Sequence, residues 1–452
     1  MKRLYAALIL TIFAAFPARA EIEIQTLTSP GGLKAWLVEE HSIPFVALEV
    51  RFRGGTSLDA PDKRGAVNLM TGLLEEGAGE LDAQGFATAR EALAARIQFD
   101  AGGDGLTVSA RMLTENRDEV VALMRSALVE PRFDADAIER VRGQVLANLK
   151  SRATDPQDIV GETFDALAYG DHPYGSYDGG TPESVAALTR DDLVAAFQGA
   201  IARDRVYVSA VGDITAAELG TLMDSLLGDL PETGAEMPVD VAFGASGGIT
   251  VVPFPSPQSV ARFGQPGIGI ESPDFFAAYL LNTILGGAGY FNSRLNQEVR
   301  ETRGLTYGIS TYLIDSDHAE SIIGAVSTVN PRMAETVEVV RAEWAKIAAE
   351  GVTAEELAAA KTYLTGAYPL RFDGNEPIAQ ILVGMQMDDR TPDYVTTRNA
   401  QVEAVTLEQI NRVAAELYRP EALRFVIVGA PEGLESSDDA GAGEPVDGPT
   451  PG

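Results

Sequence analysis

Apolar residues recur along the chain with two different periods, and each period predicts one kind of element. Short runs that are apolar or that alternate apolar and polar residues predict strands, whereas apolar residues spaced three and four apart predict helices. In the first half we expect strands at 33–38, 45–52, 97–101, 106–112 and 206–211. The helices expected there are 65–76, 83–95, 115–129, 135–151, 156–168, 190–199 and one capped by Thr215.

The same order of elements returns beyond residue 248. Between the two series, residues 231–248 lose their periodicity and fill with Gly and Pro, as expected of a linker. After this linker we expect strands at 259–270 and 424–428, a hairpin around 315–318, and helices at 275–285, 332–350, 354–367 and 407–417.

Short similar segments at matching places indicate that the two series of elements are copies of one unit. EEGAG ends at Gly79 and LGGAG ends at Gly289, while RVYVSAVG ends at Gly212 and LRFVIVG ends at Gly429. Both pairs are separated by about 210 residues, which indicates an internal duplication. We therefore predict an α+β fold of two homologous αβ halves that form a clamshell, each half with an antiparallel-rich sheet flanked by helices.

The two ends of the chain differ in composition from the halves, which we place at 21–230 and 249–430. Residues 1–20 combine basic residues, an apolar run and a final Ala-Arg-Ala, the pattern of a secretory signal peptide. Residues 431–452 carry six acidic and no basic residues among many Gly and Pro, which predicts a disordered tail. No later apolar run reaches the length of a membrane helix, so we expect no membrane span.

Charge and composition narrow the classes of function. The chain has 452 residues, a formal net charge of −31 and no cysteine. The charge disfavours nucleic-acid binding, which needs clustered Lys and Arg, and it would attract a basic peptide. The missing cysteines exclude thiolate metal sites and a Cys nucleophile, and together with the export signal they suggest a bacterial periplasm. The three histidines, His41, His172 and His318, are too far apart in sequence to form a local ligand pair.

Residues 285–310 carry the most suggestive candidate chemistry. Their pattern predicts a glycine loop, a helix that ends at Gly304 and a strand from Leu305. Arg300 and Tyr307 would then flank one turn, and both can donate hydrogen bonds to peptide carbonyls. The glycines that would let a peptide backbone approach are Gly286, Gly287 and Gly289.

Two motifs within this stretch resemble those of the pitrilysin/insulinase (inverzincin) metallopeptidases, particularly their processing-peptidase branch. They are GGAGYFNSRL at 286–295 and RETRGLTY at 300–307. DHPYG at 171–175 is similar to a further family segment, and the resemblance extends over about residues 22–430. The resemblance implies a fold of two αβ halves and a role in peptide processing.

The residues that catalytic members use to hold zinc are missing from this chain. Those members carry H-x-x-E-H on one helix and a further Glu on a later helix. In the alignment, Asn68 and Gly72 stand at the histidines, Thr71 stands at the general base, and Asn148 stands at the later Glu, with Val141 replacing another acid. We therefore expect no metal in this chain and no peptidase activity of the chain alone.

In two-subunit members of the family, one chain supplies zinc while the other can keep the Arg–Tyr pair. The resemblance thus implies a zinc-free subunit of a periplasmic heterodimer, in which Arg300 and Tyr307 bind the peptide and a homologous partner carries zinc. The alternative is a structural, assembly or peptide-binding protein with no role in proteolysis. In that case the arginine is a solvated charge and the tyrosine a packing residue.

Overall fold

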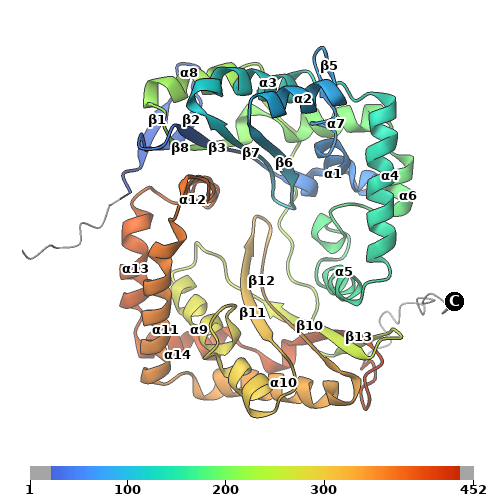
Figure 1. Ribbon diagram of the computed structural model, residues 1–452. Coiled ribbons are helices and arrows are strands. Elements are labelled where there is room, and N and C mark those ends of the chain that lie inside the picture. Colours follow the sequence, from blue (N-terminus) through green and yellow to red (C-terminus); the bar gives the residue numbers. More distant parts are fainter. Residues whose placement is uncertain (1–21, 438–452) are drawn as a thin grey trace, which may run out of the picture.

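Two mixed sheets, one in each half of the chain, organise residues 22–437, which are the residues described by the computed structural model (Figure 1). The first sheet has the order β1-β2-β8-β3-β7-β6, and only its β2–β8 pair is parallel. Its strands are β1 (Gln25–Thr28), β2 (Lys34–Glu39), β3 (Phe45–Arg53), β6 (Arg96–Ala101), β7 (Gly105–Leu113) and β8 (Val206–Gly212); β4 (Gly77–Ala78) and β5 (Leu81–Asp82) form a separate ribbon.

The second sheet repeats this plan with five strands in the order β11-β12-β10-β13-β9. They are β9 (Ile249–Pro253), β10 (Gln258–Pro266), β11 (Ile309–Ser316), β12 (Ala319–Val329) and β13 (Arg424–Gly429). Here β13–β9 is the parallel pair, in the place of β2–β8. Gly212 and Gly429, matched in the sequence, end β8 and β13 with φ values of 136° and 150°. The antiparallel-rich fold built twice is therefore confirmed.

Most helices of the first half lie close to the predicted ranges, but the helix at 182–187 was not predicted. They are α1 (Ala66–Thr71), α2 (Ala83–Ala92), α3 (Arg117–Val129), α4 (Ala135–Arg152), α5 (Pro156–Tyr169), α6 (Pro182–Ala187), α7 (Arg190–Ala200) and α8 (Ala216–Leu227). Thr215 caps α8 in a capping box with Glu218, as its position in the sequence suggested. The first helix is shorter than predicted because the amides of Leu73 and Leu74 bond three residues back, which tightens the chain beyond Thr71.

The second half contains two helices that lie outside the predicted ranges, α12 (Asn375–Met387) and α13 (Tyr394–Ala404). The others are α9 (Phe275–Gly286), the π-helix η6 (Asn296–Thr302), α10 (Met333–Glu350), α11 (Ala354–Ala367) and α14 (Leu407–Leu417). Short 3-10 turns are η1 (Gly55–Leu58), η2 (Pro61–Lys63), η3 (Thr114–Asn116), η4 (Pro173–Gly175), η5 (Arg203–Arg205), η7 (Asn330–Arg332), η8 (Tyr368–Arg371) and η9 (Pro420–Ala422).

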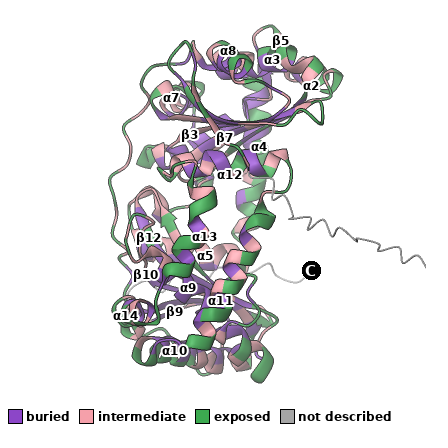
Figure 2. Ribbon diagram, turned by 90° about the vertical axis from the view of Figure 1, so that its left-hand side faces the viewer, coloured by how far each residue is buried: buried purple, intermediate pink, exposed green. Residues whose placement is uncertain are grey.

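One helix from each half packs against the sheet of the other half. Helix α5, from the first half, packs Val160, Phe164 and Ala168 against apolar residues of β9, β10, β12 and β13. Helix α12, from the second half, packs against β2, β3 and β8 of the first sheet, and Gln386 Nε2 donates to Val208 O at 2.9 Å. Figure 2 shows the buried strands as two layers, with α12 beneath the upper one. The sequence ranges 21–230 and 249–430 therefore do not separate two independently packed units.

The segment between the halves is held against both of them. Val241 N donates to His318 O at 2.9 Å, and the Phe243 ring packs on the rings of Phe164 and Tyr169. Although its composition is that of a loop, the linker 231–248 thus packs against both halves through hydrogen bonds and apolar contacts.

The expected signal peptide, 1–20, lies outside the described residues, as does most of the expected tail. The described part of that tail, 431–437, is not disordered: Ser436 Oγ and Ser437 Oγ accept from the amides of β9 at 2.9 and 2.8 Å. The sheet edge offered unpaired backbone groups, and these serines satisfy two of them. No helix among residues 22–437 is long and apolar enough to cross a membrane.

Candidate functional site

Helix α1 carries the residues aligned with the zinc motif, and they do not fit zinc. Thr71 is buried, and its Oγ1 donates to Val67 O at 2.8 Å. Gly72 follows the helix, and a Cβ at this position would lie 3.2 Å from Val141 Cγ1 of α4. Asn68 is half-buried and brings only an amide. Zinc needs imidazole, carboxylate or thiolate ligands, which an amide, a hydroxyl and a glycine cannot replace.

The two α4 residues considered for the later ligand position lie at different distances along the helix from α1. Val141 is the α4 residue beside Gly72, whereas Asn148 is exposed seven residues further along the helix. Seven residues correspond to about 10 Å of helix. Neither side chain is a metal ligand of the kind that the family uses, and the assignment of the ligand position to Asn148 stays a prediction.

A buried carboxylate stabilises the beginning of α1. Asp59 accepts hydrogen bonds from the amides of Gly65 and Val67 at 2.8 and 2.9 Å. Burial raises the pKa of Asp59 to about 6, although these amides and the Arg64 guanidinium, 3.6 Å away, oppose the rise. Asp59 is thus fully engaged in holding the turn before the helix.

The histidines lie outside α1, and two of them are unexpectedly close together. His41 is exposed and bonds to Asp213 at 2.8 Å. The rings of His172 and His318 lie 6.0 Å apart, beside the linker, where His318 Nδ1 is 3.2 Å from Asp240 Oδ1. Burial lowers the pKa of His172. In the part of the chain that the structure describes, no three His, Cys, Asp or Glu residues are grouped as metal ligands.

The glycine loop packs against the edge strand of the second sheet. Gly287 forms an isolated bridge with Thr311 of β11, and a Cβ on Gly286 would come within 2.8 Å of Thr311 Oγ1. Gly289 has φ +80°, a conformation that favours glycine. The close approach of the loop to β11 therefore accounts for Gly286, whereas a Cβ on Gly287 would meet Thr283 of α9, with 2.6 Å to its Cα.

Arg300 and Tyr307 lie on either side of the turn, as predicted, but their surroundings differ from the prediction. Arg300, on η6, has a side chain 38% exposed that lies 3.5 Å from Glu301 Oε1 and stacks over Phe291. Gly304 has the expected left-handed conformation, with φ +59°. Tyr307 is 95% exposed in a bend, because the strand begins only at Ile309.

The late start of the strand has a backbone cause. Leu305 N donates to Val299 O and closes the π-helix, while Leu305 O accepts from Thr328 Oγ1. Thr306 Oγ1 then donates to Ser327 O at 2.8 Å, which fixes the chain just before Tyr307. The predicted strand from Leu305 is therefore wrong, and no described contact joins Arg300 to Tyr307.

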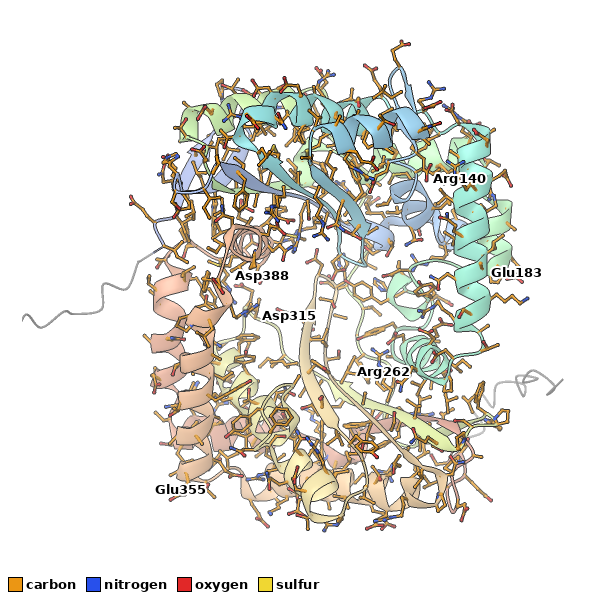
Figure 3. The ribbon with its side chains drawn as sticks, in the orientation of Figure 1. Arg140, Glu183, Arg262, Asp315, Glu355 and Asp388 are labelled. Carbon is orange, nitrogen blue, oxygen red and sulfur yellow. The ribbon has the colours of Figure 1, made fainter. Side chains whose placement is uncertain are left out.

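A cavity of about 560 Å³ with both polar and apolar lining residues lies where α5 crosses the second sheet, and the sequence pattern did not predict it. Asp165 of α5 faces Arg262 of β10, with 3.4 Å between Oδ2 and Nη1. Figure 3 shows Arg262 between the lower sheet and α5. Burial raises the pKa of Asp165 to about 6, more than the arginine lowers it. Tyr169, Tyr174 and Tyr177 also line the cavity.

Comparison with known families explains this combination of fold and altered motif. Residues 34–178 match the model of the insulinase peptidase family M16, and residues 187–364 match the model described as the peptidase M16 inactive domain. The two matches leave out only a short interval between them. The chain belongs to peptidase family M16.

Individual M16 proteins match over nearly the whole chain. A Helicobacter pylori protein named non-peptidase homolog YmxG is 26% identical, with 95% of this chain and 98% of that protein covered. An uncharacterized zinc protease of Mycobacterium tuberculosis is 27% identical, with 86% and 90% covered. The crystal structure of a peptidase M16 inactive domain from Pseudomonas fluorescens superposes with a TM-score of 0.84 at 27% identity, covering 90% of this chain and 98% of that one.

Proposed function

We propose that this M16 chain is a zinc-free, peptide-binding subunit of a heterodimeric zinc metallopeptidase in the periplasm. Its partner is a homologous chain that carries H-x-x-E-H and the zinc ion. Arg300 and Tyr307 bind the substrate backbone, and the glycine loop 286–289 guides the peptide. When bound in the partner, zinc supplies an activated water and polarises the scissile carbonyl.

The observation that carries this proposal is the contrast between α1 and the Arg–Tyr turn. On α1, the aligned positions hold an amide, a hydroxyl and a glycine, so this chain lacks its own means of activating water. At the turn, Tyr307 is 95% exposed on a backbone fixed by Thr306, so its hydroxyl is available to a second molecule. An exposed phenol that contributes nothing to the fold fits a role toward a substrate or a partner chain.

The role of each group follows from its chemistry. The Arg300 guanidinium can donate several hydrogen bonds in one plane and suits a peptide carbonyl. The Tyr307 hydroxyl can donate to an oxygen on which negative charge develops, which lowers the barrier to carbonyl addition. Arg300 must leave Glu301 and Phe291 to do this, a small rearrangement for a side chain that is partly in solvent. The periplasmic location is supported by the expected signal peptide and the lack of cysteine.

The decisive experiment uses this chain and a zinc-bearing M16 homologue from the same genome. We expect the purified chain to hold no stoichiometric zinc and to cleave no peptide, by elemental analysis and a quenched-fluorescence peptide assay. Mixing the two chains should give a complex whose chelator-sensitive cleavage exceeds that of the homologue alone.

Two other outcomes would contradict the proposal. About one zinc per isolated chain together with chelator-sensitive cleavage would make it an independent peptidase. A stable complex with unchanged cleavage would favour the structural or assembly protein. The name of the Helicobacter pylori relative, non-peptidase homolog, is consistent with that alternative.

A further inference from the structure

Two cavities meet inside the second half, away from α1. The larger, of about 620 Å³, lies among α9, α12 and α13, and the smaller, of about 330 Å³, lies between α9, β11 and α11. Both volumes fall in the range of ligand pockets. The residues shared by the two cavities, which mark their junction, are Tyr279, Tyr368, Arg371 and Arg398. A ligand at this junction can extend into either cavity.

The junction carries two arginines without carboxylate partners. Arg398 is only 5% exposed, and its Nη1 donates to Leu364 O and Asn399 Oδ1, both at 3.0 Å. Its Nε and Nη2 have no hydrogen-bond partner within residues 22–437. Arg371, exposed at the same junction, forms no ion pair with any carboxylate in that range. A buried guanidinium without an ion-pair partner is unusual, especially in a chain with a net charge of −31.

One of the residues that line the smaller cavity has a buried acceptor without a partner among the described residues. Asn282 of α9 is 6% exposed and lines this cavity, with its Nδ2 donating to Thr311 O at 3.3 Å. Its Oδ1 has no donor partner in the described chain. A buried acceptor without a partner costs free energy, and an N–H donor in the cavity would remove that cost.

The walls between these polar groups are aromatic. The Arg398 guanidinium lies 4.5 Å from the Tyr368 ring centroid and 5.5 Å from that of Tyr279, so the rings hold it in place. The acidic group on the larger cavity is Asp388, which does not line the smaller one. Figure 3 shows Asp388 near Asp315, on the inner side of the molecule. Positive charge therefore gathers at the junction and at the smaller cavity.

We propose that this junction binds the carboxylate end of a peptide. The terminal carboxylate lies between Arg371 and Arg398, the last backbone N–H donates to Asn282 Oδ1, and the terminal side chain packs on the tyrosines. Inorganic phosphate could also satisfy the arginines, and near neutral pH its remaining P–OH group could donate to Asn282, but it has no side chain to pack on the tyrosines. The site goes beyond the proposed function, because it needs neither a zinc-bearing partner nor Arg300 and Tyr307.

Calorimetric titration of the whole mature chain tests the site directly. The probes are acetyl-Ala-Leu-Phe with a free carboxylate, the same peptide as its amide, and inorganic phosphate. We expect the free acid to bind at least about tenfold more tightly than the amide, the effect of losing one or more charge-assisted hydrogen bonds. Equal affinity of acid and amide would overturn the proposal, as would failure of the acid to bind. If phosphate displaces the peptide with comparable affinity, the site binds anions in general and the peptide assignment is wrong.

Variants separate a binding role from a structural one. Because Arg371 is exposed and without an ion pair, Arg371→Gln should leave the circular dichroism spectrum and melting temperature of the chain unchanged. It should lower the affinity for the free-acid peptide about tenfold or more. Binding of the amide should not change. The matched control is Arg332→Gln, which removes a half-buried arginine paired with Glu335. If Arg371→Gln leaves the affinity unchanged, or if the control weakens it equally, the assignment fails.

Discussion

Arg53 and Asp317 form an ion pair between the two halves, with 3.4 Å from Nη1 to Oδ1. Arg53 ends β3 in the first sheet, and Asp317 lies at the tip of the β11–β12 hairpin of the second. Asp317 N also donates to Asp104 Oδ2 at 3.1 Å, and His318 N donates to Tyr174 OH at 3.2 Å. The hairpin tip thus fastens one half to the other.

The first prediction concerns this contact. Asp317→Ala should lower the free energy of unfolding by about 1–3 kcal/mol, because it leaves the partly buried Arg53 without its acid. Chemical denaturation measures the loss, and hydrogen exchange should rise at 102–104 and 316–318. Asp118→Ala, which removes a largely exposed carboxylate, is the control and should change stability by less than about 0.5 kcal/mol. A loss no larger than in this control would mean that the pair does not fasten the halves.

The second prediction concerns the Arg–Tyr turn. Arg300→Ala and Tyr307→Phe should leave folding and partner association intact, because neither side chain packs in the core. Turnover by the complex should fall, by on the order of 100-fold for one oxyanion donor. Arg303→Ala is the matched control, since Arg303 lies near the same turn but is bonded to Glu298. Should Tyr307→Phe leave turnover unchanged, or Arg303→Ala reduce it as much as Arg300→Ala, the assigned roles are wrong.

The third prediction tests whether α5 of the first half stabilises the sheet of the second half. Phe164→Ala on α5 should cost about 3–5 kcal/mol, since the ring is fully buried against the second sheet. Hydrogen exchange should increase mainly in β10 and β13, far from Phe164 in sequence. Phe197→Ala, in the core of the first half, should instead affect the first sheet. Equal effects of both variants on hydrogen exchange in β10 would contradict this role of α5.

The fourth prediction concerns pH. Burial raises the pKa of Asp165 from 3.8 to about 6, so the folded chain binds this proton more tightly than the unfolded chain does. Its contribution therefore makes the free energy of unfolding fall as pH rises from about 4 to about 6, by about 1–2 kcal/mol after allowance for partial exposure. Denaturation of Asp165→Asn at several pH values should show less of this fall. Asp171→Asn, exposed nearby, should keep the wild-type pH dependence.

Periodicity and short similar segments were sufficient to predict the duplicated fold, because strands and helices that bury one face carry a period of their own. Helix α12 also carries a helical apolar period, at Ile378, Leu382 and Met385, so the sequence contained the signal for it; what no local pattern encodes is that it covers the sheet of the other half. Helix α13 shows no such period, because only Arg398 and Val402 of its residues are buried. The strand at Tyr307 was predicted from alternation alone, whereas the backbone of Leu305 was already used to close the π-helix. The Arg371–Arg398 junction joins η8 to α13 and lay beyond sequence reasoning for the same reason.

The placement of α12 also constrains how the chain acquires its fold during synthesis. The first sheet is made early, yet the helix that covers one of its apolar faces, including Trp36, Ala47 and Val211, begins at Asn375. A ribosome adds about 5–20 residues per second, so this face stays uncovered for many seconds. Folding of the first half therefore cannot finish until almost the whole polypeptide has been made, and until then this apolar face is exposed.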